Sequence, residues 1–307
     1  MNFKHILTHH FERYRKWPTW ALVLLGCGLV ECFFIAGGFL FELARLLFLV
    51  LGILTIGQSP LLDTIANSLH VELLAFAFTA GLLFAWVKWV EKRPLITLGF
   101  YKDNRFRELL LGFGVGALQF SLSLLVVFLL GGSQFKGVDF SSTSLLFVLS
   151  IIPFWMIQGG TEELLTRAWL LPLINSRLGI AIAIGISSFL FGLMHMGNDH
   201  ITIFAFLDLL LSGIGLALFM LYRDNIWSVM GLHASWNFVQ GNIYGIEVSG
   251  SDASASLFRF ASNPQAPTWL SGGHFGIEGS LITCLVEIAF IIVILYLMKK
   301  QKADKHN

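Results

Sequence analysis

The segment Gly159–Arg167 reads Gly-Gly-Thr-Glu-Glu-Leu-Leu-Thr-Arg and lies inside a long apolar stretch. It places three ionisable side chains, those of Glu162, Glu163 and Arg167, in sequence that is otherwise hydrocarbon. On insertion scales, one charged residue at the centre of a membrane helix costs about 2.5–3.5 kcal/mol. A chain that keeps three of them together is expected to use them, most simply in a polar site that is buried among membrane helices.

The composition of the whole chain is that of a membrane protein. Its 307 residues are 56% hydrophobic and 13% charged, and the mean hydropathy is +0.75. Soluble domains carry about 25% charged residues. The net charge of +1 indicates no nucleic-acid partner. The three cysteines all lie in apolar stretches, so they indicate neither a disulfide framework nor a metal site of the CxxC type.

Several apolar runs reach the length of about 20 residues that a membrane-spanning helix needs. They predict an all-α, polytopic membrane protein with about eight transmembrane helices and a polar intramembrane cavity. The expected spans lie near residues 19–50, 68–90, 108–131, 143–173, 178–197, 201–222, 226–246 and 276–298. Residues 1–307 are expected to form a single transmembrane domain, whose motif-bearing core covers about residues 143–246.

The basic residues predict the orientation in the membrane. If the N-terminus is inside, 16 of the 20 Lys and Arg residues fall on the inner side, Lys4 and Lys305 among them, and only Lys136 and Arg259 fall in outer loops. Inner loops of membrane proteins carry the excess of Lys and Arg. We therefore expect both termini in the cytoplasm and a multi-pass protein of the inner or plasma membrane. The same count favours one crossing by residues 19–57, with a long tilted or interfacial extension, over two crossings.

Two further motifs lie on later apolar segments. Phe191 and His195 are spaced FxxxH, and His233 and Asn237 are spaced HxxxN. Residues four apart share one face of a helix. His233 and Asn237 can therefore point at one place, where their N–H groups suit the stabilisation of an oxyanion. An interhelical polar clamp is the structural alternative for this pair.

The two carboxylates of the first motif are expected to point in different directions around the helix. Glu163 and Arg167 are four residues apart and are expected to form a buried ion pair. Glu162 points about 100° away around the helix and can face a cavity as a general base. A packing network of all three side chains is the alternative, although two carboxylates against one cation leave one negative charge over.

Two mechanisms fit these residue types. In the first, Glu162, His195 and His233 bind a divalent metal such as zinc, which activates a water molecule. In the second, which needs no metal, Glu162 and His195 activate the water, while His233 and Asn237 hold the oxyanion. Both mechanisms hydrolyse an acyl bond. The sequence contains neither HExxH nor GxSxG, which are the signatures of soluble zinc proteases and of serine hydrolases.

The ordered set of EExxxR, FxxxH and HxxxN resembles the CPBP family of intramembrane proteases, which includes CAAX prenyl endopeptidases and bacteriocin-processing or immunity proteins. The resemblance implies an intramembrane endopeptidase that cleaves a membrane-associated peptide or protein in the lipid bilayer. It assigns water activation to Glu162 and His195, oxyanion stabilisation to His233 and Asn237, and supporting roles to Glu163 and Arg167. The alternative is a non-enzymatic membrane immunity, scaffold or transport-assisting protein that uses the same polar cluster for packing or ligand binding.

Overall fold

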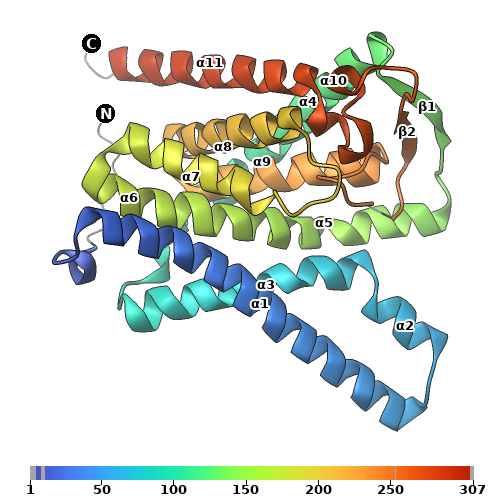
Figure 1. Ribbon diagram of the computed structural model, residues 1–307, viewed down its shortest axis with the longest axis horizontal. Helices are drawn as coiled ribbons and strands as arrows, with labels where there is room; N and C mark the ends of the chain where they lie inside the picture. Colours follow the sequence, from blue (N-terminus) through green and yellow to red (C-terminus); the bar gives the residue numbers. More distant parts are fainter. Residues whose placement is uncertain (1–4, 8–10, 253, 305–307) are drawn as a thin grey trace.

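The computed structural model describes residues 5–7, 11–252 and 254–304. Each of the eight expected spans falls on a long helical segment (Figure 1). These segments are α1 (Thr19–Ile56), α3 (Leu69–Ala85), α4 (Arg105–Leu129), α5 (Ser142–Glu163) with its continuation α6 (Leu171–Leu178), α7 (Ile180–Met194), α8 (Ile203–Arg223), α9 (Ile226–Phe238) and α11 (Leu281–Ala303). Two short helices, α2 (Pro60–Ala66) and α10 (Thr268–Ser271), lie between them. The prediction of an all-α, polytopic membrane fold is confirmed.

Helix length and composition support six of the eight expected membrane crossings. Among the described residues, six helical segments are long and apolar enough to cross a bilayer, and α5 with α6 forms one of them. The other two, α7 and α9, contain 15 and 13 residues. At about 1.5 Å per residue, each is shorter than the hydrocarbon core of about 30 Å. The expected count of eight crossings therefore stays a prediction.

Successive long helices run back and forth between the two ends of the bundle. The start of α1 and the end of α11 lie at the same end (Figure 1). Lys136 and Arg259, which are expected in outer loops, lie on the two strands at the opposite end. Lys4 and Lys305, which enter the same charge count, lie outside the described residues. The orientation relative to the cytoplasm stays a prediction.

A two-stranded antiparallel sheet covers the end of the bundle that is remote from the termini, and the sequence did not suggest it. Strand β1 (Ser133–Val138) pairs with β2 (Phe258–Ser262), with an irregularity between Phe135 and Gly137. The rings of Phe135 and Phe260 lie 5.3 Å apart and join the strands. Strand β2 lies between the expected spans 226–246 and 276–298, so this connection is in part an ordered strand.

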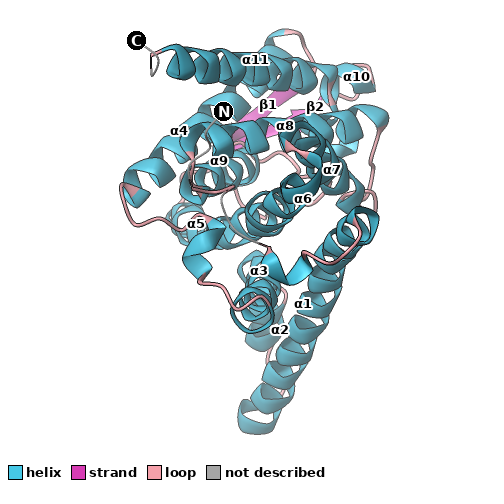
Figure 2. Ribbon diagram, turned by 90° about the vertical axis from the view of Figure 1, so that its left-hand side faces the viewer, coloured by secondary structure: helices cyan, strands magenta, loops and turns pink. Residues whose placement is uncertain are grey.

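Helices α4 and α9 pack with their backbones in close contact (Figure 2). Gly112 and Gly116 lie one turn apart on α4, and a Cβ atom at either position would collide with the backbone oxygen of Ser228 or Leu232 on α9. Gly231 meets α4 in the same way. Small residues allow such close approach of membrane helices. The contact fixes the position of α9, which carries the third motif.

Helix α1 is one continuous helix of 38 residues, so residues 19–56 do not form two separate helices. The N-terminal part of α1 packs on α3, where Gly37 lies directly against Thr79. The C-terminal part, which is named here the outer part of α1, diverges from the bundle (Figure 1) and exposes Leu46, Leu47 and Leu54. A single crossing with a long extension, as the charge count favours, is compatible with this helix.

Candidate active site

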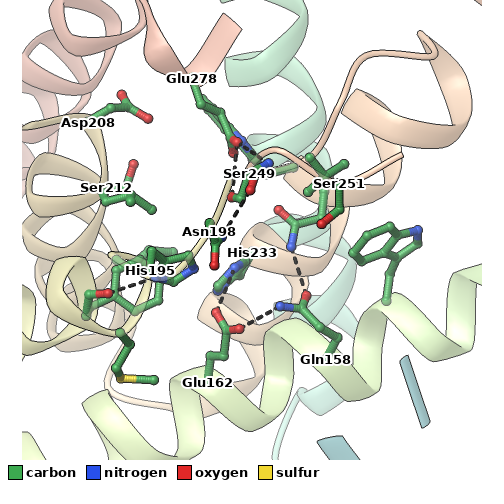
Figure 3. A pocket seen from close by; sticks show the side chains of 18 of the residues that line it. Gln158, Glu162, His195, Asn198, Asp208, Ser212, His233, Ser249, Ser251 and Glu278 are labelled. Atoms are coloured by element: carbon green, nitrogen blue, oxygen red, sulfur yellow. Dashed lines mark hydrogen bonds and ion pairs between the residues drawn. The ribbon is translucent and has the colours of Figure 1, made fainter. Parts of the chain in front are cut away.

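A cavity of about 360 Å³ lies among the helices, with side chains from α1, α3, α4, α5, α7, α8, α9 and α11 in its wall (Figure 3). Four of the six predicted site residues line it, namely Glu162, His195, His233 and Asn237. The other two, Glu163 and Arg167, lie directly behind the wall with fully buried side chains. The three motifs, which are far apart in sequence, therefore meet at one place.

Glu162 presents a free carboxylate oxygen to the cavity. Its side chain is buried, and its Oε1 atom accepts a hydrogen bond of 2.7 Å from Nε2 of Gln158. Its Oε2 atom has no hydrogen-bond partner among the described residues and lies 3.6 Å from Nε2 of His233. A buried carboxylate that is held by one oxygen and open at the other has the arrangement that a general base requires.

Behind Glu162, Glu163 joins the first motif to the third. Its Oε1 atom accepts hydrogen bonds from Nη1 of Arg167 at 3.1 Å and from Nδ1 of His233 at 2.8 Å. The guanidinium of Arg167 lies over the ring of Phe191, with 4.2 Å between Cζ and the ring centroid. The ion pair expected from the four-residue spacing is thus present, and Phe191 of the second motif packs against its cation.

Two of these helices widen into π-helical turns next to the motif residues. The segment Leu164–Leu170 follows α5 and contains Arg167, and Val239–Ile243 follows α9 and begins two residues after Asn237. Such turns insert an extra residue into a helix and are frequent at functional sites. No sequence pattern marks them in advance.

His195 lies at the C-terminal end of α7, and its ring is held in one orientation. Its Nδ1 atom is 2.8 Å from the carbonyl oxygen of Phe191. A carbonyl can only accept, so Nδ1 carries the proton. In the neutral ring, Nε2 then keeps its lone pair, as a proton acceptor needs.

Asn237 is linked to Glu162 through a residue that the sequence analysis missed. Its Nδ2 atom donates a hydrogen bond of 2.8 Å to Oε1 of Gln158, and Gln158 in turn donates to Glu162. Gln158 precedes Glu162 by four residues, so the spacing rule that paired Glu163 with Arg167 also applies to it. An amide side chain in an apolar segment gave no further signal in the sequence.

Three further buried carboxylates line the cavity and were also missed. They are Asp208 on α8, Glu278 in the short 3₁₀ turn Ile277–Gly279, and Glu287 on α11. Each lies on a different element, so no spacing in the sequence connects them. Only the packing of α8 against α9 and of α11 against α8 brings them to the same cavity.

The predicted set of zinc ligands, Glu162, His195 and His233, does not form a metal site as these side chains are placed. Within the described residues, no three His, Cys, Asp or Glu side chains gather closely enough to hold a metal ion. Only Glu162 and His233 approach each other, with 3.6 Å between donor atoms, whereas Nδ1 of His195 is turned to a backbone carbonyl. No step proposed below depends on a metal.

Residues 144–239 match the family model of the Type II CAAX prenyl endopeptidase Rce1-like proteins. This region contains all three motifs and four helical segments of the cavity wall. Comparison with the curated proteins gives no match, and comparison with the solved structures gives none either. The family match confirms the resemblance drawn from the motifs and supports, in general terms, an intramembrane endopeptidase of the CAAX type. Through this motif-bearing region, the chain is similar to the Type II CAAX prenyl endopeptidase Rce1-like proteins.

Proposed function

We propose that this protein hydrolyses a peptide bond in a membrane-associated peptide or protein, with Glu162 and His195 as the groups that activate water. The proposal rests on the Oε2 atom of Glu162. This atom is buried at the cavity wall and has no hydrogen-bond partner in the part of the chain that the structure describes. Glu162 takes a proton from the water, and the resulting hydroxide attacks the carbonyl carbon. The lone pair at Nε2 of His195 orients the same water molecule.

His233 and Asn237 stabilise the oxyanion that forms on the carbonyl oxygen. Because Nδ1 of His233 donates to Glu163, its Nε2 atom is a donor only in the imidazolium form. The oxyanion role therefore requires a protonated His233. Asn237 uses one amide hydrogen on Gln158 and has a second for the oxyanion. When the tetrahedral intermediate collapses, Glu162 returns its proton to the leaving amine.

The remaining groups hold this arrangement. Glu163 orients His233, and Arg167 balances the charge of Glu163. Gln158 fixes the carboxylate of Glu162 and the amide of Asn237 at the same time. We further propose that the protein lies in the inner or plasma membrane with both termini in the cytoplasm, as the distribution of Lys and Arg favours.

Terminal-peptide proteomics on host membranes tests the proposal. Membranes with the wild type are compared with membranes that carry Glu162→Gln at equal expression. The matched control is Glu42→Gln, because Glu42 is an exposed carboxylate on the outer part of α1. We expect new peptide termini with the wild type and with the control. With Glu162→Gln, their rate of formation should fall by about 10²–10⁴-fold, the usual contribution of general acid–base catalysis.

A parallel series with a chelator distinguishes the two mechanisms. Persistence of the new termini supports the mechanism without a metal, and their loss supports a metal. If the wild type and Glu162→Gln give the same termini at the same rate, the protease proposal is wrong, and the non-enzymatic alternative takes its place.

A further inference from the structure

The end of the cavity opposite Glu162 contains a second group of polar side chains that hydrolysis does not use. Figure 3 shows Asp208 and Glu278 there, across the cavity from Glu162 and Gln158. Glu287 lines the same cavity, and all three carboxylates are at most 5% exposed. A buried carboxylate needs a partner, because removal of a charge from water costs several kcal/mol.

These carboxylates differ in how far the protein satisfies them. Glu278 accepts hydrogen bonds from Nε1 of Trp236 at 2.9 Å and from the backbone N–H of Ser249 at 2.8 Å. Glu287 accepts one of 2.8 Å from Nε2 of Gln119. Asp208, which is 2% exposed, has no partner for Oδ1 among the described residues, and neither has Oε1 of Gln119. This end of the cavity therefore offers unpaired acceptors and few donors.

The cavity also lacks a cation of its own. Its lining includes no Lys or Arg among the described residues, and His195 and His233, the basic side chains that it does contain, belong to the catalytic group. A ligand that only donates hydrogen bonds and carries positive charge would satisfy both deficits. Ammonium and guanidinium groups are such ligands.

The spacing of the acidic side chains favours an organic cation over a metal ion. The carboxylates at this end, like the catalytic group, do not form a cluster of three that could hold a metal within the described residues. A guanidinium spreads its N–H donors over a plane and can reach acceptors that are further apart. Leu209, Leu216 and Phe290 line the same cavity and can pack on the aliphatic stem of a long basic side chain.

We propose that Asp208, Glu287 and Gln119 form a subsite that binds a positively charged group of the peptide substrate, either the side chain of Arg or Lys or a free α-ammonium group. This inference rests on the proposed protease function. It makes the enzyme selective for peptides that carry such a group within a few residues of the scissile bond.

A binding experiment tests the subsite without any cleavage. The purified full chain in nanodiscs is titrated with N-acetylarginine amide, N-acetyllysine amide and leucine amide, and with neutral N-acetylleucine amide as the control probe. The thermal midpoint is the readout. We expect at least one cationic probe to raise the midpoint and the neutral probe not to raise it. The probe that acts most strongly identifies the source of the charge.

Variants then locate the binding. Asp208→Asn and Glu287→Gln keep the shape of each side chain and remove its charge, and each is expected to weaken binding of the cationic probe by about tenfold. The matched control is Glu72→Gln, because Glu72 lines the same cavity but is exposed. This control should bind the probe as the wild type does.

Several outcomes would overturn the subsite. These are equal responses of the wild type to cationic and neutral probes, unchanged binding in both variants, or a larger stabilisation by Ca²⁺ or Zn²⁺ that both variants abolish. If neither variant folds, the comparison of the four probes on the wild type decides.

Glu162→Gln should still bind the cationic probe, so a failed protease proposal remains distinguishable from a failed subsite. If cleavage is established, the absence of basic residues or free amino groups near the cut sites would also contradict the subsite.

Discussion

The cavity wall and the outer part of α1 are both apolar in sequence, and each contains an Arg one helical turn from a Glu. At the cavity wall, Arg167 and Glu163 lie 3.1 Å apart, and both side chains are 0% exposed. On α1, Arg45 and Glu42 lie 2.8 Å apart, but their side chains are 30% and 56% exposed. The same local pattern thus gives an internal support in one region and a surface pair in the other.

The length of α1 explains the difference. A helix of 38 residues extends about 57 Å at 1.5 Å per residue, well beyond a hydrocarbon core of about 30 Å. Its outer part can therefore reach the interface, where Arg45 also donates a hydrogen bond of 2.9 Å to Asn67. Arg167 instead lies between Glu163 and the ring of Phe191, without access to water.

The largest effect on stability is expected from Arg167→Met. Loss of the cation breaks the buried ion pair and leaves Glu163 with the hydrogen bond from His233, and breaking a buried pair typically costs about 3–5 kcal/mol in the free energy of unfolding. Arg45→Met, at the exposed pair, should cost less than about 1 kcal/mol. Reversible unfolding in mixed micelles, followed by tryptophan fluorescence, measures both. Equal losses in the two variants would show that the comparison of the two regions is wrong.

A smaller loss is expected from Gly112→Ala at the contact between α4 and α9. The new Cβ atom would collide with the backbone oxygen of Ser228, and overpacking of this kind costs about 1–3 kcal/mol. Gly114→Ala on the same helix is the matched control, because a Cβ atom there meets nothing within 4 Å. The same unfolding measurement applies. If the control loses as much stability as Gly112→Ala, close packing at Gly112 does not explain the effect, because replacement of Gly by Ala within a helix otherwise favours the folded state.

Glu162→Gln should lower the free energy of unfolding by no more than about 0.5 kcal/mol, or raise it, although it lies in the same motif as Arg167. The amide oxygen of the new Gln can still accept from Gln158. The substitution removes a buried charge whose Oε2 atom accepts no hydrogen bond among the described residues and meets His233 only at 3.6 Å. The measurement is unfolding of the variant beside its activity. A loss of several kcal/mol would assign Glu162 to the structural support and would weaken the catalytic proposal.

The smallest effect is expected at the strand-covered end of the bundle, where Arg259 and Asp139 form an exposed ion pair of 2.8 Å. The backbone N–H of Ser141, with nearby hydroxyls and Arg259, lowers the pKa of Asp139 to about 2. A lowered pKa stabilises the fold above the unfolded value of about 3.9. This contribution disappears as the pH falls through about 2.

Asp139→Asn should therefore lower the thermal midpoint slightly at pH 7, and the two proteins should converge near pH 2. Thermal unfolding of both at each pH is the measurement, with added salt at pH 7 as a second check. A difference that persists unchanged at pH 2 would rule out the ionised carboxylate as its source.

Much of the fold follows from hydrophobicity, and much of the candidate site follows from helical spacing. The apolar runs predicted the positions of the long helices, because the bilayer constrains length and composition strongly. The four-residue spacings predicted which motif side chains share a face. The sheet of β1 and β2 was not predicted, because its strands are short, far apart in the sequence, and lie in segments rich in Gly, Ser and Pro. Gln158 was missed because an amide in an apolar helix carries no distinctive signal.

The sequence by itself determined that this is a polytopic helical membrane protein with three polar motifs, since the bilayer penalises every polar group without a use. The tertiary structure alone decided that Glu163 also bonds to His233 on α9, and that Asp208 and Glu287 reach the same cavity. These contacts join different helices. Their geometry depends on how closely the helices approach, and side-chain volumes along the whole bundle set that approach rather than any local pattern.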